Sequence, residues 1–158
     1  MTEKYMQIAI KEAEKAVAMD EVPIGAIIVL DGKVIAKAHN KTESNQSATA
    51  HAEILAIEKA CKKLKSWRLD GCELFVTLEP CAMCAGAIVG ARIKKVYFGA
   101  NEPKSGCVES LYPILSNSGL NHTVQFKGGI LGEQCSKMLK DYFKFKRTRE
   151  KRRKSIDY

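Results

Sequence analysis

Two cysteines, Cys81 and Cys84, follow directly on an apolar run that ends at Pro80. The run, residues 74–78, is rich in β-branched and aromatic side chains and predicts a buried strand, which a proline would end. The small and apolar residues that follow predict a buried helix, with both cysteines on one face of its first turn. The unpaired backbone N–H groups of such a turn favour thiolate over thiol. A pair of this kind can bind a soft cation or cycle as a redox dithiol, and the C-x-x-C spacing alone leaves both open.

A second pair of candidate residues, His51 and Glu53, opens another helical pattern after the polar stretch 41–49. Because each residue of a helix turns by ~100°, residues two apart point away from each other in a helix interior. His51 and Glu53 can therefore serve one site only if that site lies off the N-terminal end of the helix. The cysteines also stand at a helix start, so the pattern predicts that two helices aim their N-termini at one point.

Together, His51, Cys81 and Cys84 supply one nitrogen and two sulfurs. This set suits zinc and leaves the fourth tetrahedral position to water, which zinc acidifies towards neutrality. Glu53 is not needed as a ligand and is well placed to move the proton of that water. Taken singly, His51 is more often a structural histidine and Glu53 a solvated carboxylate, so it is the whole set that favours a site.

The pattern H-x-E followed by P-C-x-x-C resembles the signature of the zinc-dependent nucleobase deaminases. The resemblance is strongest to the bacterial tRNA-specific adenosine deaminases, in the cytidine and deoxycytidylate deaminase superfamily, and it extends over nearly the whole chain. The matching segments are residues 21–26, 40, 51–53, 77–87, 98–100, 103–104, 121–122 and 129–131. Each short segment is weak evidence alone, and the set is strong because it occurs in order at these spacings.

The rest of the chain predicts the elements that must position these residues. Helical patterns cover residues 2–19, with Thr2 as cap, 51–64 and 111–115, and an amphipathic closing helix carries Cys135 to Phe143. Strand patterns cover residues 24–30 and 34–38, joined by Asp31-Gly32, and later 95–98 and 123–126; residues 41–49 and 99–106 are expected loops. The alternation predicts an α/β fold with helices on both faces of the sheet and right-handed crossovers. The resemblance implies a three-layer cytidine-deaminase-like fold, with a five-stranded mixed sheet and both metal-bearing helices on one face.

The composition indicates one soluble globular domain with an uneven charge. Of 158 residues, 46% are hydrophobic and 28% charged, and the net charge is +8. Ten Lys or Arg and two acidic residues lie within 137–154, so the whole excess belongs to the closing helix and tail. We expect a deaminase domain over residues 1–148 and a basic tail over 149–158, in which Glu150 is the only acidic residue near the basic run. A solvated helix end is the ordinary interpretation of such a run, whereas in an RNA enzyme it favours phosphate contacts.

The cellular compartment of the protein is predicted from two sequence features, membrane-spanning runs and a signal peptide. No apolar run approaches the ~20 residues of a membrane span, and the N-terminus lacks the features of a signal peptide. Six cysteines in such a chain favour the reducing cytoplasm, with Cys61, Cys72, Cys107 and Cys135 as free thiols. We therefore expect a cytoplasmic protein without a membrane or DNA partner.

The resemblance implies a specific reaction, the hydrolytic deamination of adenosine to inosine at the wobble position of a tRNA anticodon loop, in an arginine tRNA. Zinc-activated water would attack C6 of adenine, Glu53 would shuttle protons, and ammonia would leave. One Zn²⁺ per subunit would be held by His51, Cys81 and Cys84, and the family is homodimeric.

Further residues are expected to contact the substrate. The resemblance assigns the backbone at Cys81 and Ala52 to the oxygen side of the site and Asn40 to the base or its ribose, although an asparagine after a strand equally suits a loop cap. Family members commonly carry Asp in the loop where this chain has Asn101 and Glu102, and Glu102 is one methylene longer. The remaining expected contacts are Lys104, the pair Asn121 and His122, Phe145 as a stacking residue, and the basic Lys146 and Arg147.

Two alternatives come from different classes. A deaminase of a free base or nucleoside, of the guanine or cytidine type, would share the zinc site; cytidine deaminases often have a third cysteine in place of His51, whereas guanine deaminases share the histidine. The basic tail favours RNA over a free base. A non-catalytic zinc or dithiol module would leave Glu53 and the open fourth position without a purpose.

Overall fold

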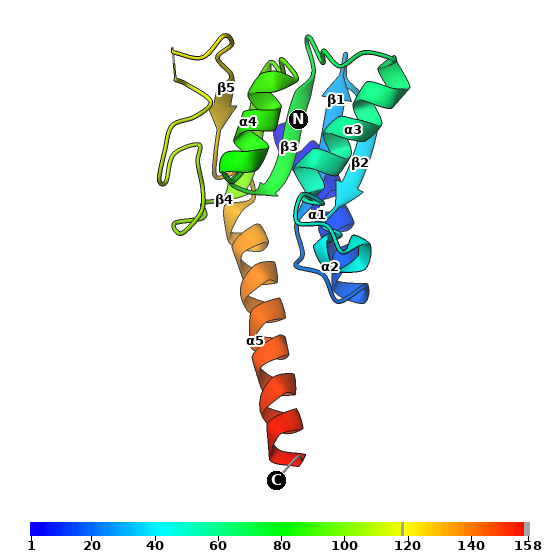
Figure 1. The fold of residues 1–158 in the computed structure, drawn as a ribbon, viewed down its shortest axis with the longest axis vertical. Coiled ribbons are helices and arrows are strands. Elements are labelled where there is room, and N and C mark those ends of the chain that lie inside the picture. The colour runs from blue at the N-terminus through cyan, green and yellow to red at the C-terminus, as the bar shows by residue number, and fades with distance from the viewer. Residues whose placement is uncertain (118, 157–158) are drawn as a thin grey trace.

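One five-stranded mixed sheet forms the centre of the computed structural model, which describes residues 1–117 and 119–156 (Figure 1). Its strands, in the spatial order β2-β1-β3-β4-β5, are β1 (Gly25–Leu30), β2 (Lys33–His39), β3 (Glu73–Leu78), β4 (Lys95–Ala100) and β5 (Gln125–Lys127). β1 pairs antiparallel with β2 and with β3, whereas β3, β4 and β5 run parallel. The predicted mixed sheet is confirmed.

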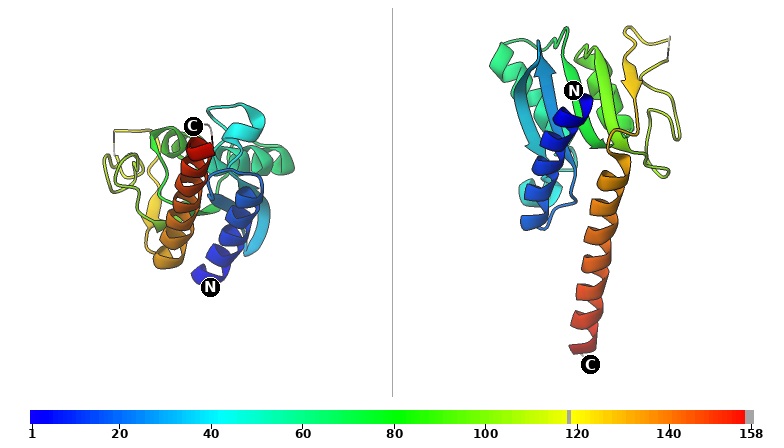
Figure 2. Two further views of the ribbon diagram at one scale, coloured as in Figure 1. Left: turned by 90° about the horizontal axis from the view of Figure 1, so that it is seen from below. Right: turned by 180° about the vertical axis from the view of Figure 1, so that it is seen from behind.

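Helices cover both faces of this sheet. They are α1 (Thr2–Ala18), α2 (Thr42–Asn45), α3 (Ala52–Leu64), α4 (Ala82–Gly90) and α5 (Gly132–Ile156). α3 and α4 pack on one face, and α1 and the start of α5 pack on the other (Figures 1 and 2). The two helices that begin at the candidate ligands therefore share a face, as the predicted three-layer fold requires.

The central strands are buried on both sides because their side chains alternate between the two helical layers. In β3, Leu74 and Val76 pack beneath α3 and α4, whereas Phe75 points into the opposite core. Phe75 stacks on Tyr97 there, with ring centroids 4.5 Å apart. This double burial fixes β3 in the middle of the molecule, and β3 leads directly into the candidate site.

α1 lies very close to the beginning of β1. A Cβ atom on Gly25 would lie 2.0 Å from the carbonyl oxygen of Ala9 and 2.6 Å from the amide nitrogen of Ala13. The approach therefore requires glycine on the strand. The Gly25 amide also donates to Thr77 Oγ1 of β3, at 3.1 Å, which ties the two strands together at the same level.

Four predicted local features are wrong in detail. Thr2 is the first residue of α1 and not its cap, and the stretch 41–49 contains the short helix α2. The helix expected at 111–115 does not form, since Pro113 lacks an N–H and disfavours a helical Tyr112. The last strand is confined to 125–127, because the amide of Val124 donates to Leu115 instead of to β4.

α5 continues without a break through residue 148, where we expected the domain to end. Its C-terminal turns project past the end of the sheet at which α3 and α4 begin (Figures 1 and 2). The last two residues of the expected tail, 157 and 158, lie outside the described residues. No helix in the described ranges combines the length and the apolar character needed to cross a bilayer.

Candidate active site

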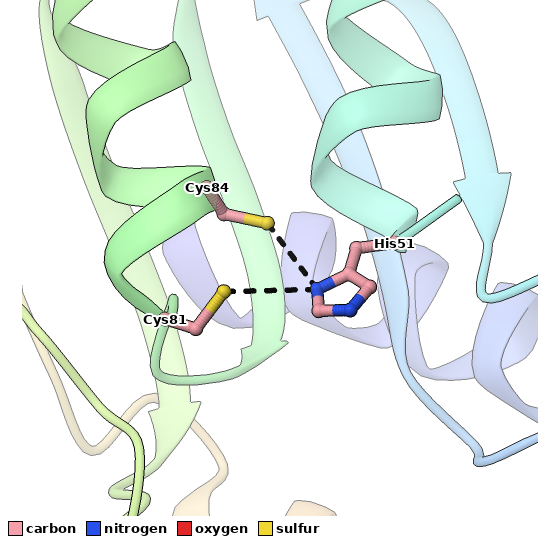
Figure 3. A group of neighbouring side chains, drawn as sticks. All are labelled: His51, Cys81 and Cys84. Atoms are coloured by element: carbon pink, nitrogen blue, oxygen red, sulfur yellow. Dashed lines mark hydrogen bonds between the residues drawn. The ribbon is translucent and has the colours of Figure 1, made fainter. Parts of the chain in front are cut away.

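The candidate ligands stand at the starts of two neighbouring helices. His51 is the residue before the first turn of α3, and Cys81 is the residue before the first turn of α4, with Cys84 one turn further on. β3 delivers Cys81 through the turn Glu79-Pro80. Both helix starts therefore meet at one point, and the predicted convergence is confirmed (Figure 3).

The three ligand atoms have the spacing of a tetrahedral zinc site. His51 Nδ1 lies 3.5 Å from Cys84 Sγ and 3.7 Å from Cys81 Sγ, and the three atoms all lie within 4.8 Å of one another (Figure 3). Zn–S bonds of about 2.3 Å and a Zn–N bond of about 2.0–2.1 Å at tetrahedral angles separate nitrogen from sulfur by about 3.5 Å. One zinc-sized cation therefore fits between these donors, whose N and S chemistry is the kind zinc takes.

The three groups share protons through hydrogen bonds. Hydrogen bonds with Cys84 and His51 lower the pKa of the Cys81 thiol to about 3. The hydrogen bond to Cys81 and burial both raise the pKa of Cys84, and the hydrogen bond to Cys81 raises that of His51 against the effect of burial. A divalent cation needs two thiolates and a neutral imidazole, so its binding here releases protons.

Glu53 lies beside these ligands as the second residue of α3. Its side chain is buried, with 4% of the residue exposed. Burial is the main reason why the pKa of its carboxyl group is raised above its ordinary value, and this group also takes part in a hydrogen bond with Cys84. A buried carboxyl group with a raised pKa holds a proton more readily than a solvated one, and beside a cation site such a group is a candidate proton carrier.

A small cavity of about 230 Å³ opens beside His51, and Asn40 forms part of its wall. Asn40 is buried, and its Oδ1 accepts a hydrogen bond from Thr42 Oγ1 at 3.0 Å. Its amide donates to the carbonyl of Ile24. Asn40 therefore caps its loop and also lines the cavity. Lys146 of α5 lines the same cavity.

A larger cavity of about 900 Å³ lies between the loop after β4 and α5. Glu102, Lys104 and Arg147 all line it. The Glu102 carboxylate accepts a hydrogen bond from the backbone amide of Lys104 at 3.0 Å, so its partner lies within its own loop. Lys146 and Arg147, neighbours on α5, thus border the two cavities on the side of the metal ligands.

Other expected contacts lie elsewhere. Phe145 is 63% exposed, lines a groove between α1 and α5, and lies beneath the guanidinium group of Arg149.

The pair Asn121 and His122 lies at the opposite end of the sheet. His122 Nε2 lies 2.9 Å from the carbonyl oxygen of Ile93, just before β4, and Asn121 is exposed next to it. That end of the sheet is one strand length, about 17–20 Å, from the end that carries Cys81. The structure does not bring these three side chains to the metal ligands, whereas Ala52, fully buried, begins α3 directly beside His51.

Two buried carboxylates flank the site, and the sequence analysis gave them no role. Glu21, 1% exposed, accepts hydrogen bonds from the amides of Glu43 and Ser44 and from Ser44 Oγ. Burial raises its pKa, but these hydrogen bonds outweigh burial and leave the pKa lowered. The available signal was an acidic residue at the start of the apolar, proline-containing segment 21–26, since a buried acid must find partners.

The second buried carboxylate, Glu79, is 2% exposed and separates β3 from Cys81. It accepts six hydrogen bonds from the loop 101–110. Burial alone would raise its pKa, but hydrogen bonds from Ser110 and from the backbone of the loop hold it at about 2. An acid directly after a largely apolar strand was again the signal in the sequence.

Comparison with known proteins identifies the family. The model of the MafB19-like deaminases matches residues 1–147. The tRNA-specific adenosine deaminase of Bacillus subtilis (strain 168) is 50% identical over 149 residues, which cover 94% of this chain and 92% of that protein. The tRNA-specific adenosine deaminase of Aquifex aeolicus (strain VF5) is 48% identical over 142 residues, which cover 90% of this chain and 93% of that protein.

Solved structures agree with this assignment. A structure from studies of A-to-I editing by tRNA:A34 deaminases at the wobble position of transfer RNA has a TM-score of 0.83 and 46% identity, and covers 86% of this chain and 99% of that chain. A guanine deaminase from Bacillus subtilis has a TM-score of 0.61 and 37% identity, and the match covers 70% of this chain and 82% of that chain. A non-catalytic zinc or dithiol module is therefore excluded, because these relatives are deaminases. The chain is a hydrolytic deaminase and belongs to the family of tRNA-specific adenosine deaminases.

Proposed function

We propose that this enzyme converts adenosine to inosine at the wobble position of a tRNA anticodon loop, in an arginine tRNA. The observation that carries the proposal is the convergence of His51, Cys81 and Cys84 beside the buried Glu53, in a chain half identical to a tRNA-specific adenosine deaminase. All six cysteines lie in the described part of the chain and are free of disulfides, which suits work in the reducing cytoplasm.

Zinc is the cofactor that fits the donor set, one ion per subunit. His51 Nδ1 and the sulfurs of Cys81 and Cys84 would hold it, and their spacing supports a tetrahedral ion. When bound, zinc lowers the pKa of a water molecule so that it can attack C6 of the adenine.

Glu53 moves the protons of the reaction. Its carboxylate takes one proton of the attacking water and passes it to N1 of the adenine. It then takes the second proton from the hydroxyl group now on C6 and passes it to the amino group, so that the C6=O bond forms, the C6–N bond breaks and ammonia leaves. One carboxyl group can serve every step because its base and acid forms are used in turn. The burial that raises its pKa favours the protonated form, which supports its role as a proton carrier.

The anticodon loop meets the protein at the two cavities beside the metal ligands. The bases of a single-stranded loop can be splayed out at modest cost, so an adenine can enter the small cavity, where Asn40 contacts the base or its ribose. Lys146 borders this cavity, and Lys104 and Arg147 border the large one. These cations are placed to contact phosphates on either side of the flipped nucleotide.

A second copy of the chain completes the assembly in our proposal. The sheet covers one side of α4, where Cys84, Ala85 and Ile88 are buried. On the other side Ala82, Gly86 and Gly90 are exposed, and a Cβ atom on either glycine would meet no heavy atom of the described chain within 4 Å. This apolar surface of small residues suits close packing against the same helix of a partner.

Ammonia release from defined substrates tests the function. The purified full chain is incubated with an anticodon stem-loop that carries adenosine at the wobble position and, separately, with free adenosine, guanine and cytidine. We expect ammonia from the stem-loop alone, and none from a matched stem-loop with guanosine at that position. Release from free guanine would instead support the guanine deaminase alternative, which the similarity to the Bacillus subtilis guanine deaminase keeps open.

A further inference from the structure

Glu79 connects the metal-binding turn with the loop 101–110. Its own amide donates to the carbonyl of Ala100 at 2.8 Å, so its backbone is fixed to the end of β4. Its side chain points into the loop, where it is almost wholly buried. In the described part of the chain no Lys, Arg or His lies within salt-bridge distance of this carboxylate. Its charge is balanced by hydrogen-bond donors of the loop alone.

The two carboxylate oxygens divide the loop between them. Oε1 accepts hydrogen bonds at the start of the loop, from the backbone amide of Glu102 at 3.0 Å and from Asn101 Nδ2 at 3.3 Å. Oε2 accepts hydrogen bonds at the end of the loop, from the backbone amides of Val108, Glu109 and Ser110 at 3.1, 2.8 and 2.9 Å. The hydroxyl of Ser110 donates to Oε1 and links the two sets. One side chain thus closes a loop of ten residues at both ends.

The loop also lies directly against Cys81. Gly106 forms an isolated antiparallel bridge with Cys81, and the amide of Cys107 donates to the carbonyl of Pro80 at 2.8 Å. A Cβ atom on Gly106 would lie 2.4 Å from Glu79 Cδ and 2.6 Å from the carbonyl oxygen of Glu102. The loop therefore wraps around the carboxylate so tightly that only glycine fits at this point.

The loop also forms one wall of the large cavity. Asn101, Glu102 and Lys104 line this wall, and Lys140, Phe143 and Arg147 of α5 line the opposite one. The position of the loop thus sets the width of the cavity in front of the basic residues of α5.

We propose that Glu79 is a positioning residue for the RNA substrate, whose carboxylate holds the loop 101–110 in the conformation that receives the anticodon loop. The inference rests on the proposed tRNA substrate. Only an ionised carboxylate can accept all six hydrogen bonds, since a glutamine amide would direct an NH₂ group at N–H and O–H donors. The preformed loop presents its wall of the cavity to RNA without being ordered at the moment of binding.

The test compares Glu79→Gln with Glu79→Asp and with the control Glu73→Gln, which makes the same chemical change at the other end of β3. For Glu79→Gln we expect KM for the stem-loop to rise about ten- to a hundredfold, with kcat changed much less and metal content retained. Glu79→Asp keeps both carboxylate oxygens on a shorter side chain, so its KM should rise less than that of Glu79→Gln. Hydrogen exchange should accelerate at the amides of residues 108–110 in Glu79→Gln and stay unchanged in the control.

Several results would overturn the proposal. They are unchanged exchange at residues 108–110, faster exchange with an unchanged KM, and a loss of metal and kcat with KM preserved. Should Glu79→Gln fail to fold, Ser110→Ala removes a single donor and carries the same measurements, with a smaller rise in KM expected. A wild-type enzyme that releases no ammonia from the stem-loop would overturn the proposed function itself, and with it the role of Glu79 toward RNA.

Discussion

The guanidinium group of Arg149 lies 2.9 Å from the carboxylate of Asp20, a residue 129 positions earlier in the chain. The other oxygen of Asp20 accepts the hydroxyl of Tyr142 at 3.2 Å. Asp20 stands just after α1 in a left-handed conformation, with φ of 56°, and is followed by Glu21 at the small cavity. α5 is thus anchored beside the site, and the basic run has an acidic partner that the local sequence around Glu150 did not reveal.

Removal of the basic turns from Arg149 onward should weaken RNA binding; it deletes the ion pair with Asp20 and keeps the hydrogen bond of Tyr142 to Asp20. Truncation after Thr148 leaves the described core contacts of α5 in place, so we expect metal content and fold to be retained. KM for the stem-loop should rise with little change in kcat, since phosphate contacts stabilise ground and transition states alike. The slope of log affinity against log salt should become shallower by roughly 0.7–0.9 for each lost phosphate contact.

The matched variant for this measurement is Asp20→Asn. Asparagine tolerates the left-handed backbone, and the change frees Arg149 from its ion pair. We expect a steeper salt slope and little change in melting temperature, because the ion pair is exposed to solvent. Identical slopes for the truncated, Asp20→Asn and wild-type proteins would show that the tail is only a solvated helix end.

Cys84→Ser should remove most of the bound zinc. Three side chains make up the whole protein contribution to the site, and serine replaces a soft thiolate by a poor ligand. Elemental analysis of the purified protein measures the loss, and Cys61→Ser, at a half-exposed thiol outside the site, is expected to keep one zinc per chain. A wild-type protein that carries a Cys81–Cys84 disulfide and no metal would contradict the zinc site.

Glu53→Ala should keep zinc and fold and lose turnover. Proton transfer by a positioned side chain contributes about 10²–10⁴-fold to a rate, and Glu53 serves at more than one step, so the loss of kcat should reach at least this range. Glu58→Ala, at an exposed carboxylate of the same helix, is the control and should leave kcat unchanged. Near-normal turnover by a zinc-loaded Glu53→Ala protein would remove this residue from the mechanism.

The stability contributed by Glu21 should depend on pH. Its folded-state pKa lies below the ordinary value of 4.5, because hydrogen bonds from residues 43 and 44 outweigh burial. A group with a depressed pKa adds stability above its unfolded-state pKa, and this stability is lost as pH falls through the folded-state value. Glu21→Gln should thus lower stability by about 1–3 kcal/mol at pH 7, and the difference from wild type should shrink below pH 4.5. Melting temperatures of wild type and variant, measured from pH 7 to below pH 4.5, test this prediction. Glu43→Gln, which changes an exposed carboxylate on α2, is the control.

Gly86→Arg should convert the proposed dimer into a folded monomer. A side chain at Gly86 meets no heavy atom of the described chain within 4 Å, so arginine fits without disturbing α4. The same side chain would occupy the surface that we assign to the partner. Sedimentation should show a dimer for wild type and for the control Glu58→Arg on α3, and a monomer for Gly86→Arg. A wild-type monomer that is active at assay concentrations would refute the dimer.

The sequence by itself determined the order of the elements and the chemistry of the site. The continuous runs of apolar, β-branched and aromatic residues in β1 and β3 and the helical periodicity in α1 are local signals, because each belongs to its own segment of the sequence. The candidate metal ligands could also be predicted from the sequence. Few residue types bind zinc, and His51, Cys81 and Cys84 each stand where a helix begins.

Only the tertiary structure decided what surrounds that site. The six hydrogen bonds of Glu79, the ion pair of Asp20 with Arg149, and the position of His122 at the far end of the sheet all join segments distant in the sequence. Residue types and local spacing carry no record of such distances. Hydrogen bonds and ion pairs form only where the order and direction of the strands bring their partners within reach, and that arrangement is a property of the whole folded chain.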